Sequence, residues 1–369
     1  MTQPAQYIMI GGFLGAGKTT AMVRFGSYLS ERGRRVGLIT NDQSTGLADT
    51  RIAEHAGFPV REITGGCFCC RFNSLMEAAD GLARDAAPDV FLAEPVGSCT
   101  DLKATVAYPL RRLYGEQFAV APFSVLVDPA RASRVLGLEA GRRFSPKVLY
   151  VYEKQLEEAD FIVVNKVDAA NADQIARLRA AIGERFPRGR LFTVSAREGT
   201  GLQEWFEAVL TEADRGETNL PIDYDIYAEG EALLGWLNCT VNVSGRGFDG
   251  NAWLETVVSD IQQRLRDRGI EIAHVKATLT SPDAADELAV VQAAGSERPV
   301  ERRYGLDAPI DSGELVVNLR AEADPDLLQA TVAGSLAAAA AAAELEAAIA
   351  HEEHFRPSRP VPTHRVALT

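Results

Sequence analysis

A glycine-rich segment near the N-terminus constrains the fold of this chain more than any other feature. Residues 12–20 read GFLGAGKTT and lie between an apolar run at residues 7–10 and a helical pattern at residues 19–32. The spacing Gly-x-x-x-x-Gly-Lys-Thr lets backbone N–H groups at the start of a helix surround phosphate oxygens. The segment therefore predicts an α/β fold that opens with a phosphate-binding loop.

The side chains of this loop have distinct predicted roles. Lys18 would reach the β- and γ-phosphates of a nucleotide, and the Thr19 hydroxyl would hold Mg²⁺. The alternative, a glycine-rich turn with an incidental lysine, does not account for its position between a strand and a helix. The predicted phosphate-binding residues are Gly12, Gly15, Ala16, Gly17, Lys18, Thr19 and Thr20.

The first two hundred residues alternate between short apolar runs and helical patterns. That order predicts βαβ units and a doubly wound, mainly parallel sheet. The apolar runs are rich in β-branched residues, as is typical of strands buried on both faces. Strands are predicted at residues 7–10, 36–40, 90–93, 123–127, 161–164 and 191–194. Helices are predicted at residues 19–32, 73–85, 146–159, 172–186 and 201–212.

The pattern changes in the second half of the chain. Residues 214–228 are polar and have no helical or strand period, which predicts an interdomain linker. We expect domains at residues 1–215 and 231–369, joined by residues 216–230. The second would be a small α+β domain with its helices on one face. Its predicted strands are 236–243, 272–279, 288–292 and 315–319, and its predicted helices are 252–267 and an alanine-rich 325–351.

A short polar motif follows the predicted strand at residues 161–164 and selects the base. It reads Asn165-Lys166-Val167-Asp168. The Asp168 carboxylate can accept hydrogen bonds from guanine N1–H and the 2-amino group, a donor pair that adenine lacks. Asn165 would stabilise the loop, the Lys166 stem would lie along the ring, and Ser195-Ala196 would offer a backbone contact to the base oxygen. The motif favours GTP over ATP.

Carboxylates also follow the predicted strands, where the ligand crevice of an open α/β sheet lies. Glu94 is the first choice for the Mg²⁺ shell, and Asp42 is the second. Either could position an attacking water, so the predicted catalytic residues are Lys18, Glu94 and Asp42. Asp128, directly before a proline, is interpreted as the start of a helix.

Three of the five cysteines fall within four positions, at Cys67, Cys69 and Cys70. Two or three thiolates this close can bind one soft cation, which predicts a metal site. The alternatives are buried free cysteines or a redox pair. A fourth ligand must come from elsewhere, and three side chains remain open for that role: Asp42, Glu62 and Cys99. His351 and His354 would share one face of the last predicted helix and are interpreted as a solvated helix end.

Composition excludes several classes of function. A formal net charge of −13 argues against nucleic acid as a partner, because binding its backbone requires clustered Lys and Arg. No run of 18 apolar residues is present, so a membrane span is not expected. The N-terminus lacks the basic and apolar regions of a secretory signal, which predicts a cytoplasmic protein.

Together the phosphate loop, the Gly-Gly-Cys-x-Cys-Cys segment, Glu94-x-x-Gly97 and Asn-Lys-x-Asp resemble the CobW-like GTPases. This class of P-loop GTPases includes the nickel chaperones for urease and hydrogenase. The resemblance implies GTP hydrolysis coupled to the handling of Zn²⁺, Co²⁺ or a similar ion, with the three cysteines as ligands and a metalloprotein as client. Two departures stand out: Asn41-Asp42 where the family often has Asn-Glu, and no His-rich tract.

Three hypotheses follow. The first is a GTP-dependent metallochaperone in which hydrolysis relaxes the loops at residues 41–46 and 65–72, so that metal affinity depends on the nucleotide. The second is a GTPase activator that assembles a corrinoid- or metal-dependent enzyme and binds metal only structurally. The third is a P-loop small-molecule kinase, which Asp168 and the lack of an arginine-rich lid oppose. A monomer and a homodimer are both open.

Overall fold

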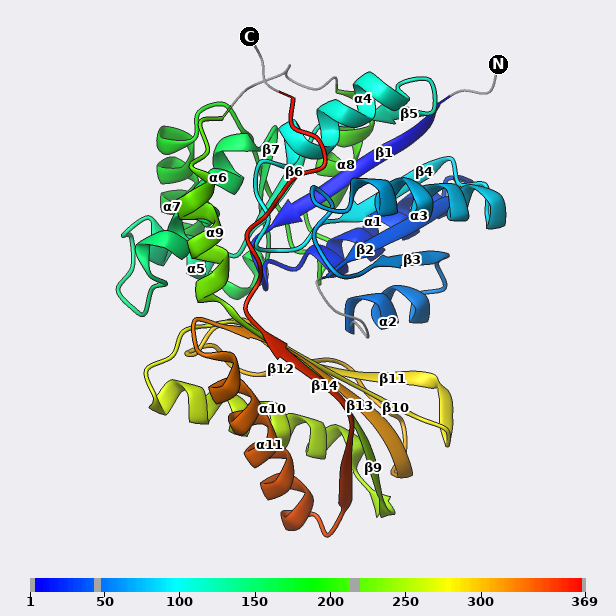
Figure 1. Ribbon diagram of the computed structural model, residues 1–369, viewed down its shortest axis with the longest axis vertical. Helices are drawn as coiled ribbons and strands as arrows, with labels where there is room; N and C mark the ends of the chain where they lie inside the picture. Colours follow the sequence, from blue (N-terminus) through cyan, green and yellow to red (C-terminus); the bar gives the residue numbers. More distant parts are fainter. Residues whose placement is uncertain (1–3, 43–47, 213–219, 367–369) are drawn as a thin grey trace. The chain divides into compact units, whose positions relative to one another are not determined.

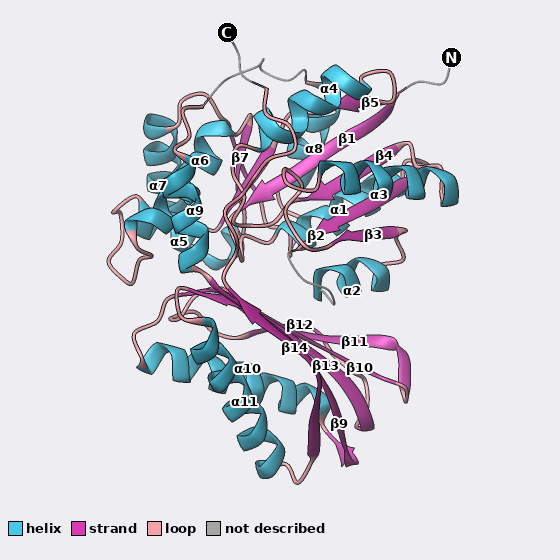
Figure 2. Ribbon diagram, viewed as in Figure 1, coloured by secondary structure: helices cyan, strands magenta, loops and turns pink. Residues whose placement is uncertain are grey.

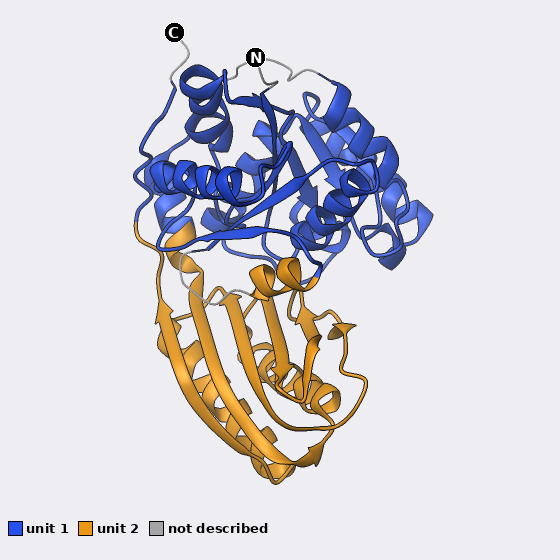
Figure 3. Ribbon diagram, turned by 90° about the vertical axis from the view of Figure 1, so that its right-hand side faces the viewer, with its two compact units in different colours: residues 1–43, 56–230, 359–369 blue, residues 44–55, 231–358 orange. Residues whose placement is uncertain are grey.

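The computed structural model describes residues 4–42, 48–212 and 220–366. The chain forms two compact units, and neither is continuous in sequence (Figure 3). The first unit comprises residues 1–43, 56–230 and 359–369, and the second comprises residues 44–55 and 231–358. Among the described residues, no helix is long and apolar enough to cross a membrane.

The first unit contains a parallel sheet with the order β3-β2-β4-β1-β6-β7-β8, and β5 pairs with β1 off this path (Figures 1 and 2). The predicted doubly wound α/β class is therefore confirmed. Its strands are β1 Ala5–Gly12, β2 Val36–Asn41, β3 Val60–Ile63, β4 Val90–Glu94, β5 Phe118–Val120, β6 Ser124–Val127, β7 Phe161–Val164 and β8 Arg190–Thr193.

Helices flank this sheet, and the five predicted ones are present as α1 Lys18–Ser30, α3 Phe72–Asp85, α6 Pro146–Glu158, α7 Ala172–Arg185 and α8 Leu202–Thr211. Several short elements were not predicted because they hold too few apolar positions to show a period. In β3, for example, only Ile63 is fully buried. The others are β5, the π-helical turn η1 Lys103–Ala107, α4 Tyr108–Tyr114 and the 3₁₀ turn η2 Val167–Ala169. Helix α5, Pro129–Val135, begins directly after Asp128, where a helix start was predicted.

The second unit is built on an antiparallel sheet with the order β12-β11-β10-β13-β9-β14. Helices α10 Gly250–Asp267 and α11 Pro325–Ala342 cover one face (Figure 2). Apolar residues such as Val241, Val317 and Leu319 alternate along the strands and bury that face. The strands are β9 Gly235–Phe248, β10 Ile272–Ser281, β11 Ala284–Ala293, β12 Glu301–Tyr304, β13 Ile310–Ala321 and β14 Glu346–Phe355.

Helix α2, Ala48–His55, also belongs to the second unit although it follows β2 in sequence. Asp49 forms an ion pair with Lys276 of β10, and the Ala48 N–H donates to Asn318 Oδ1 of β13 at 2.9 Å. Lys276 and Asn318 alternate with the residues that face α10 and α11. By strand alternation, α2 therefore packs on the opposite face of the sheet.

Two predictions about secondary structure are wrong. The alanine-rich helix ends at Ala342 rather than at residue 351, because Glu344 adopts a left-handed conformation (φ 54°) and β14 then pairs with β9. His351 and His354 consequently lie on a strand, where residues three apart point to opposite faces. The predicted linker is also not irregular throughout, since α9 forms at Tyr224–Leu233; residues 213–219 lie outside the described residues.

Candidate functional site

The phosphate loop follows β1 and has a backbone that requires glycine at two points. Gly12 (φ +129°) and Gly17 (φ +92°) adopt conformations that L side chains rarely adopt. A Cβ at Gly12 would lie 2.4 Å from the Leu126 carbonyl oxygen, and one at Gly17 would lie 2.5 Å from Asn165 Nδ2. Close contacts with neighbouring segments therefore constrain the shape of the loop.

Lys18, Thr19 and Glu94 form one buried cluster beside this loop. Thr19 Oγ1 donates a hydrogen bond to Glu94 Oε1 at 3.3 Å, and Lys18 Nζ lies 3.7 Å from the same oxygen. Lys18 and Thr19 open α1, whereas Glu94 ends β4. The fold thus brings together three of the predicted residues, and a hydroxyl with a carboxylate oxygen is a donor set that suits Mg²⁺.

The predicted base-binding residues lie directly against the phosphate loop. Asn165 Nδ2 donates to the Ala16 carbonyl at 2.9 Å, and Asn165 Oδ1 accepts from the Ala196 N–H at 2.9 Å. Lys166, in a left-handed conformation (φ 58°), donates from Nζ to the Gly15 carbonyl at 2.6 Å. Asn165 therefore joins the phosphate loop to the segment after β8.

Asp168 and Ser195 meet at the edge of the same site. Ser195 Oγ donates to Asp168 Oδ1 at 2.6 Å, so the hydroxyl orients the carboxylate predicted to accept from guanine. Asp128 caps α5, as predicted, by accepting from the Arg131 N–H at 3.0 Å, and it also lies 3.1 Å from Lys166 Nζ.

The cysteine loop is held by Asn41 at the end of β2. Asn41 Nδ2 donates to the carbonyls of Ile63 at 3.0 Å and Gly66 at 2.8 Å. Its Oδ1 accepts from the Phe68 N–H at 2.9 Å. The backbone N–H of the next residue, Asp42, also donates to Ile63. One amide side chain therefore ties the end of the sheet to both sides of the loop.

The three loop thiols form a compact group whose ligand atoms all lie within 4.8 Å of one another. The Sγ–Sγ distances are 2.8 Å between Cys67 and Cys69, 3.5 Å between Cys67 and Cys70, and 3.6 Å between Cys69 and Cys70. Four sulfurs around one zinc ion lie about 3.8 Å apart, since Zn–S bonds are ~2.3 Å in a tetrahedron. Two distances fit, and Cys67 and Cys69 would separate by about 1 Å on metal binding.

Of the three candidates for a fourth ligand, Cys99 is the side chain that reaches this group. Its thiol makes hydrogen bonds with Cys67 and Cys69. Cys99, Asp42 and Glu62 all lie outside the group of ligand atoms within 4.8 Å of one another, so the preference for Cys99 rests on its hydrogen bonds to Cys67 and Cys69. None of these cysteines is in a disulfide.

The three thiols of the cysteine loop differ in their pKa. Hydrogen bonds from Cys69, then from Cys70 and Cys99, hold the pKa of Cys67 well below its usual range. Hydrogen bonding to Cys67 raises the pKa of Cys69 well above its usual range and that of Cys70 to about 12. Binding of a cation would release protons from the other thiols, so its affinity should rise with pH.

A C-terminal segment that sequence reasoning missed, residues 359–366, runs along the cysteine loop (Figure 1). The Thr363 N–H donates to the Cys69 carbonyl at 2.8 Å, and the Val361 N–H donates to Cys70 Sγ at 3.3 Å. Arg365 Nε anchors the segment on Asp101 Oδ2 at 2.6 Å. This segment, here called the tail, has no periodic pattern that could have predicted its position.

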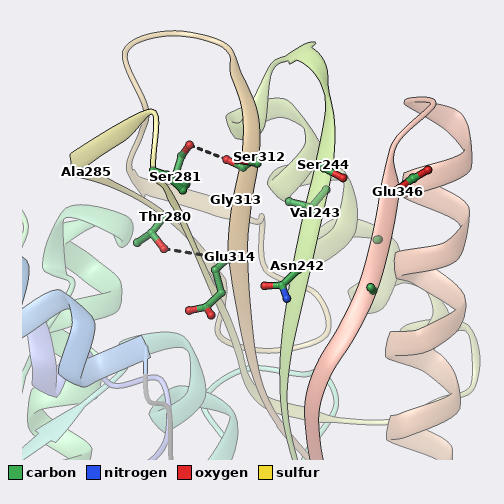
Figure 4. Close-up of a pocket in the computed structure, with 13 residues that line it drawn as sticks. Asn242, Val243, Ser244, Thr280, Ser281, Ala285, Ser312, Gly313, Glu314 and Glu346 are labelled. Atoms are coloured by element: carbon green, nitrogen blue, oxygen red, sulfur yellow. Dashed lines mark hydrogen bonds between the residues drawn. The ribbon is translucent and has the colours of Figure 1, made fainter.

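The second unit has a hollow of about 660 Å³ on the sheet face opposite α10 and α11 (Figure 4). Its lining includes Asn242, Ser244, Thr280 and Glu314. Glu314 already pairs with Arg51 of α2. Among the described residues, no group of side chains with metal-ligand spacing lines the hollow.

Comparison with known proteins identifies the family of the chain. The family model described as CobW/HypB/UreG, nucleotide-binding domain, matches residues 6–191. The chain is 27% identical over 247 residues to the zinc chaperone CobW of Pseudomonas aeruginosa, which covers 60% of each protein. It is 29% identical over 167 residues to the zinc chaperone YeiR of Escherichia coli, covering 43% of this chain and 46% of YeiR.

A probable GTPase of Mycobacterium tuberculosis, Rv1496, is 32% identical over 221 residues, covering 56% of this chain and 60% of the relative. The chain therefore matches about 60% or less of the length of these curated relatives. Among solved structures, nickel-bound HypB from Helicobacter pylori aligns with 56% of this chain and 86% of its own, at 17% identity and a TM-score of 0.41.

Zinc-bound YjiA GTPase from E. coli aligns with 90% of this chain and 99% of its own, at 16% identity and a TM-score of 0.39. At this similarity the solved structures bear on neither ligand nor site. The family model, however, matches half of the chain and includes the phosphate loop, the cysteine loop and Asn165 to Asp168. The chain belongs to the CobW/HypB/UreG family, as its motifs predicted.

Proposed function

We propose that this protein binds and hydrolyses GTP and couples hydrolysis to the delivery of a zinc- or cobalt-type ion to a client protein. The observation that carries the proposal is the register between β2 and β4. Thr40 pairs with Glu94, so Asn41, which holds the cysteine loop, follows directly beside the carboxylate that contacts Lys18 and Thr19. The phosphate and thiol sites therefore share the carboxyl edge of neighbouring strands, where ligands bind in open α/β sheets.

Guanine recognition rests on Asp168, oriented by Ser195. The carboxylate would accept from both guanine donors, and adenine would leave it unmatched. This opposes the kinase alternative, which needs ATP. The ammonium of Lys18 would stabilise negative charge on the γ-phosphate as water attacks phosphorus and the bond to GDP breaks. Thr19 and Glu94 would hold Mg²⁺, which supplies further positive charge when bound.

Glu94 and Asp42 differ in their suitability for positioning the attacking water. Glu94 is buried against Lys18 and Thr19, whereas Asp42 is partly exposed at the end of β2. We assign Glu94 to the metal shell and Asp42 to the water. Asp42→Asn should then lower kcat more than tenfold with little change in GTP affinity, whereas Glu94→Gln should weaken Mg²⁺-dependent binding.

The transported ion would bind to the three loop thiols. Soft thiolate ligands select Zn²⁺ and similar ions over Mg²⁺. The decisive test is competition titration of Zn²⁺ against a chromophoric chelator with GDP and with a non-hydrolysable GTP analogue. Coupling predicts affinities that differ by about 5- to 150-fold. Equal Zn²⁺ affinities with the two nucleotides would exclude coupling between hydrolysis and metal binding. Loss of Zn²⁺ binding in Cys69→Ser would still show that the ion binds at the cysteine loop.

Base selection is tested separately. Asp168→Asn should weaken GTP binding and favour xanthosine triphosphate, because the new amide donates where xanthine has a carbonyl. Asp173→Asn is the matched control, since Asp173 lies in the exposed first turn of α7. Unchanged GTP affinity in Asp168→Asn would refute the base assignment while leaving metal binding untouched.

One observation favours the second candidate, a GTPase activator with a structural metal. Cys67 and Cys69 are only 4% and 1% exposed, respectively, and the tail bonds to Cys69 and Cys70. Structural zinc sites are closed in this way. A structural ion would exchange over hours whatever the nucleotide. An ion in transit would pass to a chelator faster in one nucleotide state than in the other.

A further inference from the structure

The position of Cys99 in the fold links the two sites of the first unit. Cys99 follows Glu94 by five residues, and its buried thiol contacts Cys67 and Cys69. Glu94, at the start of the same segment, contacts Lys18 and Thr19. Residues 94–99 therefore begin at the phosphate loop and end at the thiols.

The middle of this segment is also packed tightly. A Cβ at Gly97 would lie 3.0 Å from the backbone nitrogen of Leu14 in the phosphate loop. The side-chain amide of Gln155, on α6, donates to the carbonyls of Gly97 at 2.9 Å and Cys99 at 2.8 Å. A shift of the phosphate loop or of Glu94 would consequently move the backbone that carries Cys99, because packed segments transmit displacement.

We propose that Cys99 is the fourth metal ligand and the one that the nucleotide moves. The inference rests on the proposed function and deepens it. The ion would be held by four thiolates in one nucleotide state and by three in the other. Loss of one ligand opens a coordination position, as in sites that exchange ligands, and a donor from the client could enter there. Each thiol that binds the ion releases its proton to solvent.

The first experiment needs no substitution. Zinc K-edge X-ray absorption of the wild-type protein, loaded with one Zn²⁺, counts the sulfur ligands at about 2.3 Å. We expect four sulfurs in one of the two states, GDP or non-hydrolysable GTP analogue, and three in the other. Three sulfurs in both states would exclude Cys99 as a ligand. Four in both would exclude its movement.

The second experiment compares Cys99→Ser with Cys239→Ser. Both cysteines are 1% exposed, but Cys239 lies in β9 of the second unit. Cys99→Ser should weaken Zn²⁺ binding more than about 100-fold in the four-thiolate state, beyond the loss expected for an outer-shell residue. It should also make the affinities with GDP and GTP analogue equal. Cys239→Ser should change neither value.

The outcomes separate this inference from the proposed function. Wild-type affinity and undiminished nucleotide dependence in Cys99→Ser would overturn the inference, and loss of Zn²⁺ binding in Cys69→Ser would then leave the three-thiol site intact as proposed. If Cys99→Ser and Cys69→Ser both bind Zn²⁺ like the wild type, the proposed function fails as well. Thermal unfolding of the metal-free variants shows whether they fold. If Cys99→Ser does not fold, the number of sulfur ligands in the wild-type protein still tests the inference.

Discussion

The phosphate and base site and the thiol site lie in the same unit but are built differently. The first is assembled from two continuous motifs, and the Asn165 side chain links them by donating to the Ala16 carbonyl and accepting from the Ala196 N–H. The second depends on side chains and segments from distant parts of the chain, namely Asn41, Cys99 and the tail. A rigid nucleotide site beside a thiol site held by several separate bonds is a suitable arrangement for one site to control the other. Four predictions break or sharpen this contrast.

The largest effect is expected at Gly17. Gly17→Ala should lower GTP affinity more than about 100-fold, because the added Cβ meets Asn165 Nδ2 at 2.5 Å and the positive φ costs about 1–2 kcal/mol. Isothermal titration with a non-hydrolysable GTP analogue and with Zn²⁺ measures both sites.

Gly33→Ala is the matched control. Gly33 also has a positive φ (+74°), yet nothing lies within 4 Å of its Cβ position, so it shares the strain without the clash. Zn²⁺ binding should survive in both variants with nucleotide absent. Parallel loss of both ligands in Gly17→Ala would contradict the separate construction of the sites.

A second effect is expected at Asn41. Asn41→Ala removes three hydrogen bonds that hold the cysteine loop and should cost about 3 kcal/mol of unfolding free energy, at about 1 kcal/mol each. Zn²⁺ affinity should fall ~10- to 100-fold, as for outer-shell partners of metal ligands. Urea unfolding and Zn²⁺ competition measure these. GTP binding that falls as far as Zn²⁺ binding would show that Asn41 serves both sites equally.

The third prediction concerns Glu158, which lies at the end of α6 and holds the segment after Cys99. Its carboxylate accepts from Thr100 Oγ1 and from the Lys103 N–H. Burial raises its pKa to about 8. Because the folded pKa lies above the unfolded one, the folded protein keeps a proton that the unfolded chain loses. The contribution to stability is therefore full below the unfolded pKa of Glu and is lost as pH rises towards 8.

Glu158→Gln should abolish this fall in the free energy of unfolding with rising pH. In the wild type the fall is at most about 1.4 kcal/mol per pH unit between the unfolded and folded pKa values of Glu158. Urea unfolding of both proteins at several pH values from 5 to 9 gives the difference in slope. Parallel curves would mean that Glu158 is ionised in the folded protein.

The smallest effect is expected in the tail. Arg365→Ala breaks the half-buried ion pair with Asp101 and should speed Zn²⁺ dissociation about fivefold, equivalent to ~1 kcal/mol. Stopped-flow mixing of the zinc-loaded protein with a chelator measures the rate. Arg268→Ala is the control, because Arg268 is exposed in the second unit and donates to a backbone carbonyl. Equal rates in the two variants would mean that the tail does not restrict the ion.

The same contrast explains how far the sequence could predict the structure. Gly12 to Thr20 and Asn165 to Asp168 encode their positions locally, since turn geometry and strand ends follow from the motifs themselves. Cys99 could be named only as one of three candidates, because spacing in sequence does not give distance in space. The tail could not be predicted at all, as its bonds to the cysteine loop come mainly from backbone N–H groups that every sequence offers.

Predictions in the second unit failed where two principles competed. The alanines at residues 337–343 favour helix and extend α11 to Ala342, but the predicted continuation to residue 351 fails because residues 346–355 pair with the sheet edge at β9. Tertiary pairing there outweighed local propensity. Helix α2 escaped prediction for a related reason, since its contacts with Lys276 and Asn318 lie more than two hundred residues away.

The interleaving of the two units has a practical consequence. The chain passes between them four times, after residues 43, 55, 230 and 358. Residues 231–358 expressed alone would lack α2 and would leave Lys276 and Glu314 without the ion pairs they make with it. A single proteolytic nick would likewise release neither unit as a complete body. Dissecting this protein calls for circular permutation or point substitutions rather than truncation.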